Sequence, residues 1–251
     1  MKNISHIPAV EVSHLTVSYG DNFVLSDCSV TIPQGVMLGI IGPNGAGKTT
    51  FIKAILELLP RQKGIVSICG KELQHVRNKI AYVPQRSSVD WDFPLTVFDM
   101  VLMGCYGKLG WLKRPGAIER AQVYEALAAV GLERYADASI GTLSGGQQQR
   151  AFVARALVQD AHVYFLDEPF AGVDIPTEKI IISLFKKLRD EGKTIIVVHH
   201  DIVTAAAYFD WALLLNKTVV ACGPIETVLT AHNFAHVYGG NGLLDLISRS
   251  S

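Results

Sequence analysis

The residues with the clearest chemical meaning form a glycine-rich segment at positions 42–49, which reads GPNGAGKT. This segment matches the phosphate-loop pattern GxxxxGK[ST], and it lies between an apolar run and a stretch with helical spacing, as such a loop requires. Glycines let backbone N–H groups curl around an anion, and the positive end of the following helix points at it. Lys48 would reach the β- and γ-phosphates, and the Thr49 hydroxyl would hold Mg²⁺. A glycine-rich turn can match by chance, but the strand–loop–helix context favours nucleotide binding.

Two carboxylates, Asp167 and Glu168, follow the apolar run at 163–166 and precede Pro169. They stand at the C-terminal end of an expected strand, the edge at which open α/β sheets bind ligands. Asp167 can support the Mg²⁺ shell, and Glu168 can take a proton from the attacking water. Alone, Asp-Glu-Pro would be interpreted as a polar strand end that starts a turn. With a phosphate loop on an earlier strand, the pair indicates hydrolysis instead.

The segment 143–150, which reads LSGGQQQR, indicates a second anion site. Ser144 is suited to cap a helix, and Gly145 and Gly146 expose backbone N–H groups at its positive end. A purely structural capped helix is the alternative. That alternative does not explain the Gly-Gly-Gln run that continues through Gln147.

The elements that must position these residues follow from the hydrophobic pattern. Loose alternation over 9–35, with a turn signal at 20–22, predicts antiparallel strands joined by a hairpin. Short apolar runs predict strands at 36–41, 65–69, 79–83, 163–166, 194–198, 212–215 and 218–221. Helical spacing predicts helices at 49–59, 97–103, 117–130, 147–158, 176–190 and from 225 onwards. Strand–helix alternation around a helical insertion predicts an α/β fold with a parallel core and a helical subdomain.

Composition narrows the classes of function. The chain has 251 residues, with 23 Lys+Arg against 23 Asp+Glu, and its length fits one α/β domain. Zero net charge argues against a duplex DNA binder, so we expect no nucleic-acid partner. A charged fraction of 18% and a mean hydropathy of +0.26 hint at a partner surface.

Cysteines and apolar runs bear on the compartment. Cys28, Cys69, Cys105 and Cys222 lie far apart without a CxxC pair, which favours buried reduced thiols over a zinc site or disulfides. No apolar run reaches the roughly 18–20 residues that a membrane span needs. Residues 1–6 lack the apolar segment of a signal peptide. The chain is therefore expected in the cytoplasm.

With the three motifs in this order, residues 10–240 resemble the ATP-binding subunit of an ATP-binding cassette (ABC) transporter. The resemblance implies a P-loop NTPase core with an antiparallel β subdomain and an inserted helical subdomain. It further implies one nucleotide-binding domain over 1–251, with 1–86 and 161–251 as core and β subdomain and about 87–160 as the helical signature subdomain. The bound groups it implies are ATP and Mg²⁺.

The resemblance also implies roles for single residues. Tyr19 would stack on adenine, although it could be an ordinary strand tyrosine. Gln85 would touch Mg²⁺ or the water and sense the membrane partner, and Asp174 would cross a dimer interface. Mg²⁺ would be held by Thr49, Gln85 and Asp167. Contacts to the nucleotide are implied for Gly42, Pro43, Asn44, Gly45, Ala46, Gly47, Lys48, Thr49 and Thr50.

Two adjacent histidines invite a metal-site interpretation. Neighbours on an extended strand point to opposite faces, so His199 and His200 would not easily share one ion. Directly before Asp201, His200 resembles the switch histidine that contacts the γ-phosphate, and His199 is interpreted as a structural neighbour.

The resemblance implies catalysis by a pair of chains. Ser144, Gly145, Gly146 and Gln147 would cap the γ-phosphate of the ATP held by a second copy, in a two-fold homodimer that sandwiches two ATPs. Hydrolysis at Glu168, with Gln85 and His200, would reopen the dimer. The chain is thus expected to be an active ATPase.

The segment 86–96 (RSSVDWDFPLT), together with 104–107, 170–174 and the double histidine, resembles the branch of bacterial importers for manganese, zinc or ferrous iron. Manganese is favoured within that branch. This implies a peripheral subunit on the cytoplasmic face of the inner membrane, an integral membrane permease and, indirectly, an extracytoplasmic metal-binding protein. Trp91 and Phe93 would lie where the permease docks, unless they pack in the core.

Other members of the superfamily differ from this sequence in their architecture. A DNA-repair ATPase would carry a long coiled coil between Lys48 and Ser144, and a translation-factor ATPase would carry two cassettes; the sequence has neither. A soluble assembly ATPase, such as one that serves iron–sulfur cluster biogenesis, stays open. Association with a membrane protein would distinguish the two.

Overall fold

The computed structural model describes residues 7–89, 91, 93–109 and 113–239. Residues 1–6, for which the sequence predicted no signal peptide, lie outside this described part of the chain. So do Asp90, Asp92 and Gly240, which the resemblance included. The chain divides into two compact units: unit 1 comprises Met1–Arg77 with Ile196–Ser251, and unit 2 comprises Asn78–Ile195.

Unit 1 contains an antiparallel three-stranded sheet in the order β2-β1-β4. The predicted hairpin is confirmed: β1 (Val10–Tyr19) pairs with β2 (Asn22–Ile32) up to the pair Tyr19↔Asn22 beside the turn. β4 (Lys63–Ile68) pairs with the other edge of β1. Alternating burial along β1 places one face of this sheet in the core.

The second sheet of unit 1 is built around β3 (Met37–Ile41), which is buried along its whole length. β3 pairs in parallel with β8 (Trp211–Asn216), and β8 pairs antiparallel with β9 (Thr218–Pro224). The helices of this unit are α1 (Lys48–Ile55), α7 (Ile202–Tyr208), α8 (Ile225–Val228) and α9 (Ala231–Tyr238). β7 (Thr194–Val198) begins in unit 2 and ends in unit 1.

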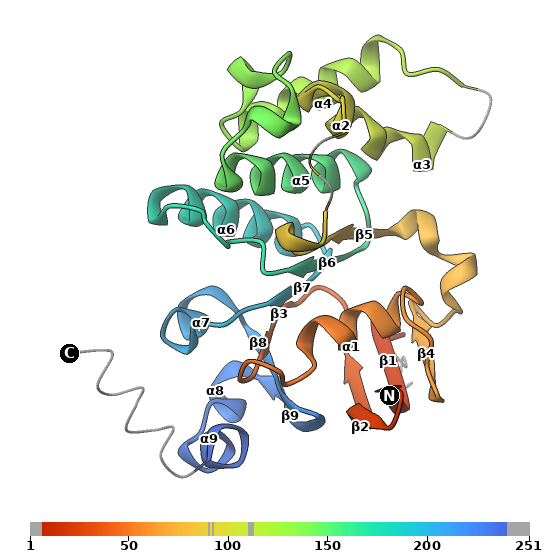
Figure 1. The fold of residues 1–251 in the computed structure, drawn as a ribbon, viewed down its shortest axis with the longest axis vertical. Helices are drawn as coiled ribbons and strands as arrows, with labels where there is room; N and C mark the ends of the chain where they lie inside the picture. The colour runs from red at the N-terminus through yellow and green to blue at the C-terminus, as the bar shows by residue number, and fades with distance from the viewer. Residues whose placement is uncertain (1–6, 90, 92, 110–112, 240–251) are drawn as a thin grey trace, which may run out of the picture. The chain divides into compact units, whose positions relative to one another are not determined.

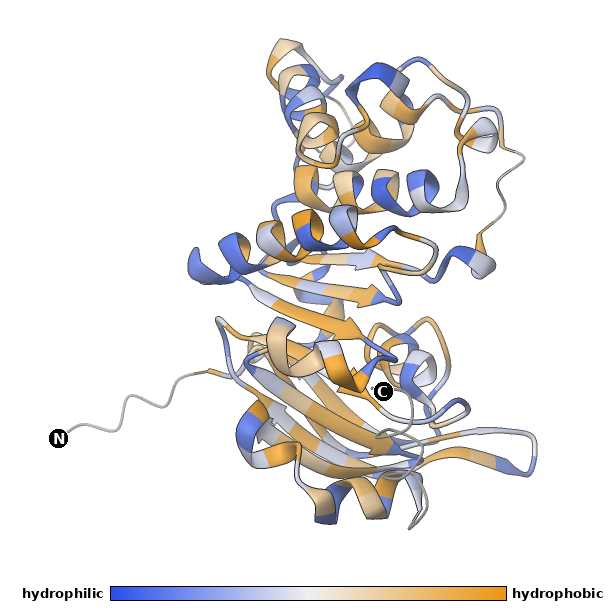
Figure 2. Ribbon diagram, turned by 90° about the vertical axis from the view of Figure 1, so that its left-hand side faces the viewer, coloured by the Kyte–Doolittle hydropathy of each residue, from blue (hydrophilic) through white to orange (hydrophobic). Residues whose placement is uncertain are grey.

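Unit 2 combines two parallel strands with helices. β5 (Ile80–Val83) pairs with β6 (Val163–Asp167) in parallel. The helices are α2 (Val97–Leu102), α3 (Tyr106–Leu109), α4 (Ala117–Ala129), α5 (Gly145–Gln159) and α6 (Ile175–Asp190). α5 packs on α2 and α4 with one side and on β5 with another, so it connects the helices to the strands (Figure 1). Figure 2 shows hydrophobic residues along the short buried strands, as expected for strands covered on both faces.

Packing explains where the units divide. The boundaries lie at 77/78 and 195/196, whereas the division expected from the sequence lies at 86/87 and about 160/161. Because α5 packs on β5, the strand clusters with the helical segment rather than with the phosphate loop.

Two details of the helices differ from expectation. α1 ends at Ile55 rather than at Leu59, because Glu57 adopts a left-handed backbone (φ 54°) that a helix cannot continue through. α7 was not predicted; it begins where the Asp201 carboxylate accepts a hydrogen bond from Val203 N at 2.9 Å.

Two predictions from the sequence concerned the state of the cysteines and the lack of a membrane-spanning segment. All four cysteines are free thiols; Cys28 and Cys105 are buried, and Cys69 and Cys222 are half-buried. Among the helices of the described residues, none has the length and apolarity to cross a bilayer.

Candidate functional site

The phosphate loop in unit 1 closes around its own lysine. The loop leads from the buried strand β3 into α1, and Gly47, the N-cap of α1, has φ 92°. A Cβ on Gly47 would lie 2.7 Å from Leu25 Cδ2, so the loop passes close to β2. The buried Lys48 donates from Nζ to the carbonyl oxygens of Gly42 (2.7 Å) and Pro43 (2.9 Å). The ammonium group is thus held inside the curve of the loop, at the N-terminus of α1, where an anion is favoured.

Solvent exposure differs among the other residues of the loop. Asn44 and Gly45 are exposed, and Thr49 and Thr50 are half-buried on the first turn of α1. Gly42 and Ala46 are buried. The exposed tip therefore leaves its backbone accessible to a ligand.

Two further predicted residues lie in unit 1. Tyr19, at the end of β1, is 53% exposed, which leaves its ring open for stacking. His200 is exposed, whereas His199 is buried, with its Nε2 atom 2.8 Å from Thr204 Oγ1 and its ring 5.4 Å from that of Phe209. Burial lowers the pKa of His199 to about 4, so its imidazole is neutral near pH 7.

The predicted carboxylates end β6 in unit 2. Asp167 is fully buried, and the half-buried Glu168 has a left-handed backbone (φ 52°), a strained conformation of the kind found at functional sites. Gln85, which follows β5, donates from Nε2 to Glu168 Oε2 at 2.9 Å. The structure therefore brings together two predicted residues that are 83 positions apart.

Residues 143–150, called the signature segment from here on, lead into α5, the signature helix, through a capping box. Ser144 N donates to Gln147 Oε1 at 2.8 Å, and Gln147 N donates to Ser144 Oγ at 3.4 Å. A Cβ on Gly146 would lie 2.5 Å from the carbonyl oxygen of Gly172, so the helix start rests directly on the loop before α6. These contacts fix the first turn of α5 against that loop.

Asp174 ends the same loop as the N-cap of α6. Its Oδ1 accepts from Thr177 Oγ1 at 2.8 Å, and its Oδ2 accepts from Thr177 N at 3.3 Å. These hydrogen bonds lower the pKa of the exposed Asp174 carboxyl, so it is ionised at neutral pH. Asp174 thus has a structural task in unit 2 as well as its expected role at a dimer interface.

A cavity of about 410 Å³ in unit 2 joins these segments. Sequence reasoning missed part of its lining, although Arg86 is adjacent to Gln85 and Gly172 is two positions before Asp174. The lining residues are Gln85, Arg86, Ser87, Ser144, Gly145, Gly146, Ala171 and Gly172.

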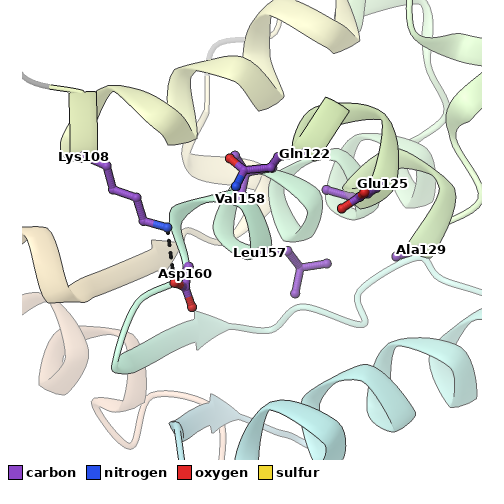
Figure 3. Close-up of a pocket in the computed structure, with 8 residues that line it drawn as sticks. Lys108, Gln122, Glu125, Ala129, Leu157, Val158 and Asp160 are labelled. Atoms are coloured by element: carbon purple, nitrogen blue, oxygen red, sulfur yellow. Dashed lines mark hydrogen bonds and ion pairs between the residues drawn. The ribbon is translucent and has the colours of Figure 1, made fainter. Parts of the chain in front are cut away.

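A second cavity of unit 2, of about 290 Å³, has a different lining (Figure 3). Its lining includes Asp160, which accepts from Lys108 Nζ at 3.3 Å and from Lys193 Nζ at 2.8 Å. Lys108 and Asp160 are paired with each other, Glu125 is exposed, and the lining includes no predicted site residue, so nothing in this cavity points to a reaction. The lining residues are Lys108, Gln122, Glu125, Ala126, Ala129, Leu157, Val158 and Asp160.

The predicted magnesium ligands form an all-oxygen donor set. They comprise the hydroxyl of Thr49 in unit 1 and the Gln85 amide and Asp167 carboxylate in unit 2. This is the donor chemistry that Mg²⁺ prefers. Among the residues that the structure describes, no three His, Cys, Asp or Glu side chains gather as a transition-metal site would require.

The segment after Gln85 differs along its length. Trp91 is half-buried and packs edge-on against Phe152 of α5, with ring centroids 5.3 Å apart. Phe93, in contrast, is 60% exposed. Trp91 therefore packs on α5 without being fully buried, whereas Phe93 stays exposed.

Comparison with known proteins agrees with this arrangement. The sequence profile of the family described as ABC transporter matches residues 25–171. The zinc transport system ATP-binding protein TroB of Treponema pallidum (strain Nichols) is 55% identical, over 92% of this chain and 87% of that protein. The manganese transport system ATP-binding protein MntB of Bacillus subtilis (strain 168) is 54% identical, over 92% of both chains.

Solved structures are similar over nearly the whole chain. An ATP-binding subunit of an ABC transporter superposes with a TM-score of 0.78 at 26% identity, covering 96% of this chain and 98% of that one. A dimeric bacterial ABC transporter cassette superposes with a TM-score of 0.77 at 30% identity, covering 86% and 98%. Because both the family profile and relatives above 50% identity match, the chain belongs to the ABC transporter family, as an ATP-hydrolysing ATP-binding subunit.

Proposed function

We propose that this subunit hydrolyses ATP to drive the import of a divalent transition metal, manganese in the first instance, through a separate integral membrane permease. The relatives that support a metal as cargo are named for zinc in one case and manganese in the other, at nearly equal identity. Zinc is therefore the first alternative cargo, and ferrous iron, which only the sequence resemblance implies, is the second; uptake measurements decide among the three metals.

The hydrogen bond between Gln85 and Glu168 carries the catalytic part of the proposal. It aims the Glu168 carboxylate from the end of β6 toward the Gln85 side chain, at the ligand-binding edge of the strand. Glu168 would accept the proton of the attacking water, and Gln85 would orient that carboxylate and the water. His200, which is exposed, would contact the γ-phosphate.

The phosphate loop would hold the nucleotide. Its backbone N–H groups and the Lys48 ammonium would neutralise phosphate charge, and Tyr19 would stack on adenine. Thr49, Gln85 and Asp167 would hold Mg²⁺, which when bound neutralises charge on the β- and γ-phosphate oxygens.

A second copy would complete each site. The capped helix start at Ser144 presents an open, positive N-terminus that could face the γ-phosphate of the partner's ATP. Gly145, Gly146 and Gln147 would share this role, and Asp174 would cross the interface. A dimeric cassette among the similar structures supports the two-fold arrangement.

The permease would anchor the subunit at the cytoplasmic face of the inner membrane. The exposed Phe93 next to α2 offers an apolar contact for a helix of the permease. An extracytoplasmic metal-binding protein would meet the permease and not this chain.

The test is a tagged chain purified from detergent-solubilised cells, combined with uptake of manganese, zinc and iron by the same cells. A polytopic partner should co-purify, and Glu168→Gln should abolish uptake of one metal while leaving the complex intact. Glu133→Gln, at an exposed glutamate of unit 2, is the matched control and should leave uptake unchanged.

Two outcomes would contradict the proposal. Normal steady-state hydrolysis by Glu168→Gln would refute the general-base role. Recovery of soluble partners only, with uptake of all three metals unchanged, would favour a soluble assembly ATPase.

A further inference from the structure

The segment that follows Gln85 is attached to α5 at two points on one face of that helix. Arg86 contacts Gln148, and Trp91 contacts Phe152. Positions four apart on a helix lie one above the other, so the segment runs along this face. Gln85, directly before this segment, donates a hydrogen bond to Glu168.

The first attachment is a directed chain of hydrogen bonds. Arg86 Nε donates to Gln148 Oε1 at 2.9 Å, and Gln148 Nε2 donates to the carbonyl oxygen of Ile140 at 3.2 Å. Gln148 is buried, and both ends of its amide are used, so the amide can take only one orientation. A buried amide that lost the Arg86 donor would leave its oxygen unsatisfied, which is costly.

The Arg86 side chain also packs against Gly145 of the signature segment. A Cβ on Gly145 would lie 2.9 Å from both Cζ and Nε of Arg86, so the side chain lies against the first residue of α5. Arg86 therefore touches the glycine beside Ser144 while its backbone neighbour Gln85 touches Glu168.

The second attachment holds the far end of the segment. Trp91 Nε1 donates to the Arg86 carbonyl oxygen at 3.1 Å, and the Trp91 carbonyl oxygen would lie 2.8 Å from a Cβ on Gly141. The indole hydrogen bond thereby links Trp91 back to Arg86. The segment also contacts both α5 and the turn around Gly141, before the signature segment. It can move only together with the start of α5, or by breaking these bonds.

We propose that Arg86 is a positioning residue that ties Gln85 to the signature helix, so that the Gln85–Glu168 contact and the first turn of α5 move as one element. A displacement of this segment would then act on hydrolysis at the chain's own Glu168 and on the anion site that this chain offers to a second copy. The inference rests on the proposed roles of Glu168 and Ser144.

A double-mutant cycle on the full chain tests the proposal through steady-state ATP hydrolysis. Arg86→Ala and Gln148→Met should each lower kcat about tenfold and leave the KM for ATP within about twofold, because misplacement of a catalytic group acts on turnover. The double variant should be no slower than either single variant, since both remove the same link. Arg114→Ala, at an exposed arginine of unit 2, is the matched control and should behave as wild type.

Three results would overturn the proposal. Effects that multiply to about a hundredfold in the double variant would show that Arg86 and Gln148 act separately. Wild-type turnover in Arg86→Ala would show that the hydrogen bond between Arg86 and Gln148 does not affect hydrolysis. A raised KM with unchanged kcat would make Arg86 a nucleotide contact instead.

The same experiment controls for unfolding of the variants and for the proposed catalytic role of Glu168. Gln148 is buried, so if Gln148→Met unfolds, Arg86→Lys is compared with Arg86→Ala instead. Lysine keeps a cationic donor for Gln148 Oε1 and should retain more turnover than alanine, whereas equal losses in the two variants would overturn the proposal. Glu168→Gln is measured in parallel. If it leaves turnover unchanged, the proposed site fails; if it abolishes turnover while the cycle is multiplicative, only the Arg86 inference fails.

Discussion

Gln85 Nε2 lies 2.9 Å from Glu168 Oε2, and the two half-buried side chains meet across the parallel pair β5–β6. An amide is a neutral donor, so it orients the carboxylate without adding a charge next to it. The contact therefore suits the proton-acceptor role proposed for Glu168.

Gln85→Glu should convert this contact into a pair of carboxylates that share a proton. Two carboxylates at this distance do not both ionise at the pH at which one alone would. We expect hydrolysis at neutral pH to fall roughly tenfold and the acidic limb of the pH–rate profile to move up by about one pH unit or more. The measurement is kcat/KM for ATP between pH 5 and 9.

Gln85→Ala provides the control for that profile. It also removes the amide but adds no charge, so its acidic limb should stay at the wild-type position while its rate falls. An identical upward movement in both variants would mean that the second carboxylate is not the cause.

Ser144 combines a cap and a proposed phosphate contact, and two substitutions separate these roles. Ser144→Ala should lower the free energy of unfolding by about 1 kcal/mol, because α5 loses its side-chain cap. Ser144→Asp should keep the cap and the stability but abolish hydrolysis, because a carboxylate would face the γ-phosphate of the partner's ATP. Stability is measured by denaturant unfolding and activity by phosphate release.

Normal hydrolysis by Ser144→Asp would show that Ser144 does not approach a phosphate. Unchanged stability in Ser144→Ala would show that the capping hydrogen bond from Gln147 N, at 3.4 Å, contributes little.

The sequence predicted the motifs and the elements that carry them more completely than the contacts among them. Apolar runs as short as those of β3 and β6 are informative because they end in residues with chemical meaning, Gly42 and Asp167. The contact between Gln85 and Glu168 was implied only in part, since spacing along the chain does not say which side chains meet across neighbouring strands.

Other features could not be predicted because they depend on tertiary packing. Arg86 is an ordinary surface residue type in sequence, and its hydrogen bond to Gln148 depends on how α5 packs. The end of α1 depends on the positive φ of Glu57, a conformation that its residue type does not favour. The unit boundary depends on α5 packing against β5, which hydrophobic periodicity does not specify.

Gly45 and Gly47 offer a matched test of the phosphate loop. Both have positive φ, 78° and 92°, so alanine costs backbone strain of about 1 kcal/mol at either position. A Cβ on Gly45 meets nothing within 4 Å, whereas one on Gly47 would lie 2.7 Å from Leu25 Cδ2 and 3.1 Å from the Val24 carbonyl oxygen. Gly47→Ala should therefore be less stable than Gly45→Ala by a further 1–3 kcal/mol or so, measured by denaturant unfolding. Equal losses would mean that the loop does not pass close to β2.

His199 should make the stability of the protein depend on pH. Its pKa is about 4 in the folded chain, because of burial, against 6.5 for the ordinary group, so between these values the unfolded chain binds more protons. The stabilisation is thus fully present above about pH 6.5 and is lost as the pH falls toward 4, by an amount on the order of 3 kcal/mol.

His199→Gln removes this titration while keeping a polar group beside Thr204. The variant should show a flatter decline in the free energy of unfolding between pH 7 and pH 4.5 than the wild type. His232→Gln, at an exposed histidine, should retain the wild-type slope. A wild-type slope in His199→Gln would place the proton uptake on other groups, and it would mean that the His199 imidazole is more accessible to water than its burial against Phe209 implies.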